Sequence, residues 1–239
     1  MTTIADNLQR LHQRIAAACT AAGRDVNDVT LLAVSKTFGP EAVRAAQAQG
    51  QAAFGENYIK EGVEKAALLA DLQLQWHCIG PIQSNKSRLV AAHFDWAHTV
   101  DRLTVAQRLS EQRDTRLPPL QVCIQVNVDG GPTKAGVPPA GALALAREVA
   151  ALPNLRLRGL MTIPEPAPDF ASQLAVHQKA RRLFDSLRDA GLALDTLSMG
   201  MTADLEAAIQ AGSTLVRVGT AIFGGRSDAN VTSSVARSA

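Results

Sequence analysis

Residues 30–40 read T-L-L-A-V-S-K-T-F-G-P, and this stretch decides how the rest of the chain is interpreted. Its apolar run has the length of a buried strand and ends at Lys36, before Gly39 and Pro40 break the pattern. Lysine is rarely buried without a partner, but at a strand end its amine can enter a pocket and act as a nucleophile. A second interpretation is that Lys36 simply begins a surface loop.

The same order of strand, loop and helix recurs outward from this stretch. Strand-like runs occur near residues 30–35, 52–54, 74–79, 96–100, 120–128, 155–161, 196–199 and 215–218. An amphipathic helix over residues 4–19 precedes them, and helical patterns separate them. Eight such units in 239 residues predict a (β/α)8 TIM barrel with an extra N-terminal helix. An open doubly wound sheet is the alternative, but no G-x-G-x-x-G motif follows the first strand.

Neither a linker nor a shift in composition divides the chain, so we expect one domain over residues 1–239, with about 227–239 as a flexible tail. The net charge is only +2 and the basic residues are scattered, which does not favour nucleic-acid binding. The three cysteines have no metal or disulfide spacing and are typical of buried thiols in a reducing compartment. With neither a signal peptide nor a membrane-spanning run, we expect a cytoplasmic protein without membrane contact.

In a barrel the chemistry lies at the C-terminal ends of the strands. Polar residues gather at these positions, among them Lys36, Asn57 and His77. The loops after the last two strands are rich in glycine and hydroxyl groups, as phosphate-binding loops of barrels are. They read S-M-G-M-T at 198–202 and G-T-A-I-F-G at 219–224.

Arg217 interrupts the last strand, two residues before the second of these loops, and a buried guanidinium needs acceptors. An ion pair across the barrel with Glu56 or Asp204 would supply them. Alternatively, Lys36, the phosphate loops and Arg217 share one ligand, an aldehyde that carries a phosphate. Pyridoxal 5′-phosphate is such a molecule, held as a Schiff base on Lys36 with Arg217 at its ring nitrogen. A phosphosugar-binding barrel enzyme is a further reading, which predicts no Schiff base.

Six motifs, spread in order over essentially the whole chain, resemble those of the pyridoxal phosphate homeostasis proteins. They are A-V-S-K-T at 33–37, F-G-E-N-Y at 54–58, W-H-C-I-G-P-I-Q-S-N-K at 76–86, G-L-M-T-I at 159–163, L-S-M-G-M-T-A-D at 197–204 and V-R-V-G-T-A-I-F-G-G-R at 216–226. The family is similar in fold to the barrel domain of alanine racemase. Thr202, where serine is common, and Gly225, at a variable position, are small departures from its pattern.

The resemblance implies a fold-type III pyridoxal phosphate barrel in which Lys36 carries the Schiff base. It implies that Arg217 faces the pyridine nitrogen and that the phosphate lies at Ser198, Gly219 and Thr220. The full set of cofactor-binding residues that we expect is Lys36, Asn57, His77, Met161, Ser198, Met199, Gly200, Arg217, Gly219 and Thr220. His77 can equally be a satisfied core histidine, and Lys134 either guides phosphate or is a solvated loop lysine.

The family is regarded as a carrier and buffer of the cofactor, without demonstrated catalysis. Arginine can only donate to the ring nitrogen, which makes the ring a poor electron sink. A racemase also needs a base on each face of the substrate carbon, and Tyr58, the only tyrosine, begins a helix where packing is its expected role. We therefore expect a monomeric, non-catalytic carrier that contacts apoenzymes transiently, with a small racemase-like enzyme as the alternative.

Overall fold

The computed structural model describes residues 2–131 and 135–225, and its core is a closed barrel of eight parallel strands in sequence order. The strands are β1 (Thr30–Val34), β2 (Ala53–Glu56), β3 (Gln75–Cys78), β4 (Trp96–Val100), β5 (Leu120–Gln125), β6 (Leu155–Met161), β7 (Thr196–Ser198) and β8 (Leu215–Val218). Because β8 pairs with β1, the barrel has no open edge. The predicted (β/α)8 barrel is therefore confirmed, and the alternative of an open doubly wound sheet is wrong. The predicted tail and Lys134 lie outside the described residues.

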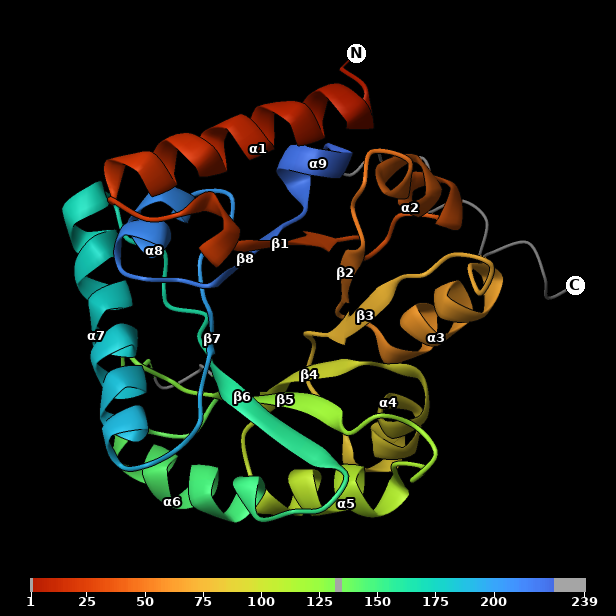
Figure 1. Ribbon diagram of the computed structural model, residues 1–239, viewed down its shortest axis with the longest axis vertical. Helices are drawn as coiled ribbons and strands as arrows, with labels where there is room; N and C mark the ends of the chain where they lie inside the picture. Colours follow the sequence, from red (N-terminus) through yellow and green to blue (C-terminus); the bar gives the residue numbers. More distant parts are fainter. Residues whose placement is uncertain (1, 132–134, 226–239) are drawn as a thin grey trace, which may run out of the picture.

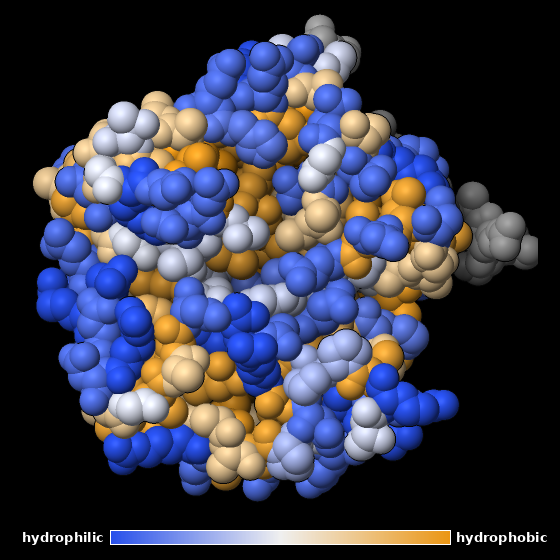
Figure 2. Space-filling view, in the orientation of Figure 1, coloured by the Kyte–Doolittle hydropathy of each residue, from blue (hydrophilic) through white to orange (hydrophobic). Residues whose placement is uncertain are grey.

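Helices surround the strands on the outside of the ring (Figure 1). They are α1 (Ile4–Ala21), α2 (Pro40–Gln47), α3 (Ile59–Leu68), α4 (Ser87–His93), α5 (Leu103–Gln112), α6 (Pro139–Ala150), α7 (Phe170–Asp189), α8 (Leu205–Gln210) and α9 (Thr220–Phe223), with 3₁₀ turns η1 (Val26–Asp28) and η2 (Ser84–Lys86). No helix in residues 2–131 and 135–225 is long and apolar enough to cross a membrane. Hydrophilic side chains gather across the centre of the face seen in Figure 2, with apolar ones between the surrounding elements.

Helix α1 is the predicted extra helix, and it lies outside the barrel against α8 and α9. Thr3 and Asp6 form a capping box at its start, which satisfies two otherwise unpaired backbone N–H groups. Its buried face includes Leu8, Leu11 and Ile15, as the sequence spacing predicted. Asn7 on the same helix donates a hydrogen bond to the carbonyl of Ile222 at 2.8 Å, so α1 supports the turn that follows β8.

The strands place alternate side chains inside the barrel and against the helices, because the side-chain period of a strand is two. The large apolar cluster lies between sheet and helices, and two small clusters remain separate from it. One contains Leu32 and Leu215 and the other contains Trp96 and Met161. By this alternation Arg217 shares the inward face of its strand with Leu215.

One strand boundary differs from the sequence prediction. Strand β5 ends at Gln125 rather than Val128, because Val126 leaves the ladder and pairs with Val137 beyond the following loop. Helix α8 begins at Leu205, after a turn in which Asp204 accepts a hydrogen bond from the amide of Met201 at 2.6 Å. In the same turn the carbonyl of Thr202 accepts a hydrogen bond from Arg14 of α1 at 2.8 Å.

Candidate functional site

A cavity of about 240 Å³ opens at the C-terminal ends of the strands. Loops that follow six strands contribute to it, which is the arrangement that places active sites at this end of barrels. Its lining consists of Val34, Lys36, Thr37, Phe38, Asn57, Ile79, Ile163, Met201, Thr202, Arg217, Gly219, Thr220, Gly224 and Gly225. Among the described residues, no group of His, Cys, Asp and Glu is arranged to hold a metal ion. The lining joins the charged Lys36 and Arg217 to apolar side chains, which suits an organic ligand with polar ends.

Lys36 lies at the cavity wall, half-buried, and its amine has no hydrogen bond or ion pair with any described residue. The backbone around it is held firmly. Phe38 donates to the carbonyl of Ser35 at 3.1 Å, and the amide of Thr37 donates to Glu61 Oε1 at 2.6 Å. Thr37 has a φ of 68°, which is strained for a β-branched residue and persists only where the surroundings hold it. The result is a fixed backbone that presents a free amine.

Beneath this turn lies a buried ionic cluster that the sequence analysis did not find. Lys65 of α3 donates to Glu56 Oε1 at 2.8 Å, to Glu61 Oε1 at 2.7 Å and to the carbonyl of Ser35 at 2.7 Å. Ser35 Oγ also donates to Glu56 Oε1 at 2.6 Å. Burial raises the pKa of Glu56, and the neighbouring Lys65 partly offsets that effect. The cluster ties β1, β2 and α3 together directly under the strand end that bears Lys36.

Arg217 extends from inside the barrel to the cavity and is buried. One terminal nitrogen donates to both the carbonyl and the hydroxyl of Ser198 at 2.8 Å, and the other donates to the carbonyl of Thr162 at 2.8 Å. It makes no ion pair with Glu56 or Asp204, because these bind Lys65 and His177 instead. A guanidinium has five N–H groups, so two remain without a partner in the described part of the chain. Burial lowers the pKa of Arg217 to about 10, which still leaves it charged near neutral pH.

The turn from β8 into α9 supplies further donors. Thr220 and Ala221 lie in the first turn of α9, where backbone N–H groups have no intrahelical acceptor. Gly219 allows this turn to approach β1 closely, because a Cβ at its position would lie 3.0 Å from the carbonyl oxygen of Val34. Gly219, Thr220 and Thr202 line the same cavity as Lys36. An anionic group fits here by its hydrogen-bonding chemistry.

Five of the ten predicted site residues line the cavity, namely Lys36, Asn57, Arg217, Gly219 and Thr220. The other five, His77, Met161, Ser198, Met199 and Gly200, do not line it. His77 is buried within the barrel, where its ring stacks on Trp96 with centroids 5.1 Å apart, and Met161 packs on the same tryptophan. Met199 faces the outer core.

Apolar residues of the cavity were not singled out from the sequence. Phe38 stacks on Phe223 with centroids 5.1 Å apart, and Ile79 and Ile163 add apolar wall. Only their position could have indicated them in the sequence, since Phe38, Ile79 and Ile163 each follow closely on the end of a strand. Such side chains suit one face of a planar ring.

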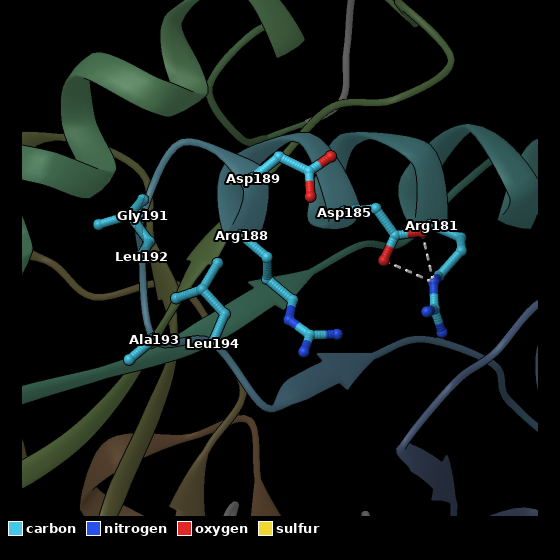
Figure 3. Close-up of a pocket in the computed structure, with 8 residues that line it drawn as sticks. All are labelled: Arg181, Asp185, Arg188, Asp189, Gly191, Leu192, Ala193 and Leu194. Carbon is cyan, nitrogen blue, oxygen red and sulfur yellow. Dashed lines mark hydrogen bonds and ion pairs between the residues drawn. The ribbon is translucent and has the colours of Figure 1, made fainter.

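A larger hollow of about 600 Å³ lies at the end of α7 and the loop that follows it (Figure 3). Arg181 and Asp185 pair on one face of the helix there, with the charged side chains of Arg188 and Asp189 nearby. None of the predicted site residues lines this hollow. Its charges fit a solvated helix end, so the candidate site remains the mouth of the barrel.

Comparisons with known proteins agree with this fold. The model of the alanine racemase N-terminal domain family matches residues 6–227. The pyridoxal phosphate homeostasis protein of Pseudomonas aeruginosa is 58% identical over 226 residues, covering 95% of this chain and 97% of its own. The structure of PipY from Synechococcus elongatus with pyridoxal phosphate bound is 36% identical, with a TM-score of 0.77 over 88% of this chain and 100% of that chain.

Alanine racemase of Clostridium difficile shares the fold, with a TM-score of 0.71 over 91% of this chain and 57% of its own, at 15% identity. The closed barrel, the lysine at the end of β1 and the arginine in β8 are thus found in a chain that matches these relatives along nearly its full length. The chain belongs to the alanine racemase N-terminal domain family and, within it, to the pyridoxal phosphate homeostasis proteins.

Proposed function

We propose that this protein binds pyridoxal 5′-phosphate at the mouth of the barrel, as a Schiff base on Lys36, and acts as a carrier and buffer in cofactor homeostasis. The observation that carries the proposal is one cavity lined by both Lys36 and Arg217, whose amine and two remaining N–H groups have no partner among the described residues. When bound, the cofactor supplies an aldehyde that condenses reversibly with an amine. The relatives' names and the ligand of the PipY structure support the same assignment.

The residues present fit this cofactor. Arg217 can donate to the acceptor nitrogen of a pyridine ring, and the Gly219–Thr220 turn can donate to a phosphate. The side-chain oxygen of Asn57 is buried at the cavity without a protein partner in the described residues, so a polar ligand group is expected beside it. Ser198 is not expected to touch the phosphate, because its hydroxyl is bonded inside the barrel.

The carrier role is favoured over the racemase-like alternative by what lines the cavity. Lys36 and Arg217 are the ionisable side chains among the lining residues that the structure describes. Racemisation needs a second base opposite the lysine, and Tyr58 is 55% exposed and does not line the cavity. An arginine at the ring nitrogen also keeps that nitrogen unprotonated, which weakens the ring as an electron sink.

We further propose a monomeric protein of the cytoplasm, organised as one barrel unit, that hands the cofactor to apoenzymes by transient contact. The three cysteines are free and buried, which suits a reducing compartment. Analytical ultracentrifugation of the purified protein checks the monomer, and a dimer at micromolar concentration refutes it.

The proposal is tested by adding pyridoxal phosphate to the purified protein, reducing with borohydride and mapping the modified peptide by mass spectrometry. We expect modification of Lys36, its loss in Lys36→Ala, and its retention in Lys60→Ala, which removes an exposed lysine outside the cavity. The loaded protein is then mixed with an apoenzyme, and recovery of that enzyme's activity is measured. Steady turnover of a D- or L-amino acid that Lys36→Ala abolishes refutes the carrier role.

A further inference from the structure

A continuous line of side-chain hydrogen bonds runs inside the barrel and ends at Arg217. Gln75 Oε1 lies 2.9 Å from His77 Nε2, and His77 Nδ1 lies 2.9 Å from His98 Nε2. His98 Nδ1 lies 3.0 Å from Ser198 Oγ, which lies 2.8 Å from the terminal nitrogen of Arg217. Four strands, β3, β4, β7 and β8, contribute to this line. Both histidines, Ser198 and Arg217 are buried.

The chemistry of the two ends decides the direction of every bond. Arginine can only donate, so Ser198 Oγ accepts from Arg217. At the other end Gln75 Oε1, a carbonyl-type acceptor, fixes the proton of the neutral His77 at Nε2 and leaves its Nδ1 to accept. His98 therefore donates from Nε2 to His77 Nδ1, and its unprotonated Nδ1 accepts a hydrogen bond from the hydroxyl of Ser198. Each of the three inner members, Ser198, His98 and His77, donates once and accepts once within the line, and no bond places two protons against each other.

These hydrogen bonds require both imidazoles to be neutral, because each ring uses one nitrogen as a donor and the other as an acceptor. The surroundings of both rings favour the neutral form. Burial lowers the pKa of His77 to about 3. Burial, together with the neighbouring His77 and the charge of Arg217, lowers the pKa of His98 well below its usual value. A second proton on His98 would point an N–H group at the serine that must accept from Arg217.

We propose that His98 is a positioning residue for Arg217, acting through Ser198, with His77 holding His98 in the required tautomer. Because the hydroxyl of Ser198 donates its hydrogen bond to His98, a lone pair of its oxygen faces the guanidinium. That lone pair and the carbonyls of Ser198 and Thr162 hold three of the five N–H groups. The remaining two are then aimed at the cavity. This inference rests on the proposed binding of pyridoxal phosphate.

Two variants of similar size, His98→Leu and His98→Asn, distinguish a role of His98 in positioning Arg217 from a role in packing alone. In His98→Leu the serine proton loses its acceptor and is free to turn toward the guanidinium. In His98→Asn the side-chain oxygen lies where Nδ1 was and can still accept from Ser198, although both variants lose the contact with His77. We expect pyridoxal phosphate to bind about tenfold more weakly to His98→Leu, the loss of one charge-assisted hydrogen bond, and within about threefold of wild type to His98→Asn. Ser87→Ala, a buried serine of α4 that is hydrogen-bonded away from the cavity, is the control with unchanged binding.

Nitrogen NMR of the ¹⁵N-histidine-labelled wild type provides a second test that does not depend on variant folding. We expect two neutral imidazoles protonated at Nε2, with or without the cofactor. Equal binding by His98→Leu and wild type, equally weak binding by His98→Leu and His98→Asn, or Nδ1-protonated rings would each overturn the positioning role while leaving the proposed function intact. A wild-type protein that takes up no pyridoxal phosphate refutes the proposed function, and the positioning role with it.

Discussion

Replacing Lys65 with methionine is expected to lower the free energy of unfolding by about 3–5 kcal/mol. Methionine is close to lysine in volume and one atom shorter, and it removes the charge together with the N–H donors that bond to Glu56, Glu61 and the carbonyl of Ser35. Lys65 is 4% exposed and its partner Glu56 is fully buried, so no water can replace the ammonium group. One oxygen of Glu56 already lacks a partner, and the other would keep only the hydroxyl of Ser35.

The structure also predicts an asymmetry between the two partners. Glu56→Gln leaves Lys65 bonded to Glu61 and to the carbonyl of Ser35, so its cost is expected to be about 1–2 kcal/mol. In the double variant no uncompensated charge stays buried, and we expect it to recover about 2–3 kcal/mol of the loss in Lys65→Met. Removing Lys65 alone is thus expected to lower the free energy of unfolding much more than replacing Lys65 and Glu56 together.

Urea unfolding followed by the fluorescence of the buried Trp76 and Trp96 measures these differences at constant m-value. Lys60→Met is the control, because it makes the same substitution at an exposed position of the same helix and is expected to change stability by less than about 0.5 kcal/mol. If Lys65→Met lies within about 1 kcal/mol of wild type, or the double variant is no more stable than Lys65→Met, the cluster is not a buried ion pair of the kind described.

Three further outcomes are expected. Burial raises the pKa of Glu56 in the folded state above its ordinary 4.5 in the unfolded state. The free energy of unfolding therefore falls as the pH rises from the unfolded-state pKa to the folded-state pKa. Lys65→Met is expected to raise the folded-state pKa further and so to widen this pH interval. The penalty of Lys65→Met should therefore shrink as the pH falls toward the ordinary pKa of 4.5, and a penalty that grows on acidification contradicts this reasoning. Gly200→Ala is expected to lower the free energy of unfolding by about 2–4 kcal/mol, because φ at this position is 94° and the new Cβ would lie 2.4 Å from the Cβ of Ala208. Thermal denaturation measures this loss, and a loss below about 1 kcal/mol contradicts the prediction. Thr37→Gly should raise the free energy of unfolding by about 0.5–1 kcal/mol by relieving the positive φ, and a loss of stability would show that this turn is not strained.

Much of the site could be located from the sequence because parallel strands end together. Once eight strands were recognised, Lys36, Asn57, Gly219 and Thr220 had to lie at one end of the barrel, and the structure places all four on one cavity. Arg217 was expected there or in an ion pair across the barrel. The structure favours the first, because Glu56 points outward to α3 and is already paired.

His77 and Ser198 show where such reasoning stops. Each is close to a strand end in the sequence, yet each side chain lies inside the barrel and is bonded to His98. Position along a strand predicts which end a residue is near, but depth within the barrel depends on strand tilt and register. His98 lies in the middle of β4, so nothing in its local sequence marked it.

The sequence by itself determined the number and order of the strands, the family, and the lysine and arginine around which the proposed cofactor site is built. These depend on local periodicity, on glycine-rich turns and on motifs, all of which are properties of short segments. Only the tertiary structure decided which partner each buried polar group takes. Lys65 with Glu56, and His98 between His77 and Ser198, join residues from different elements, because a buried polar group must find a partner wherever the closed barrel brings one within hydrogen-bonding distance.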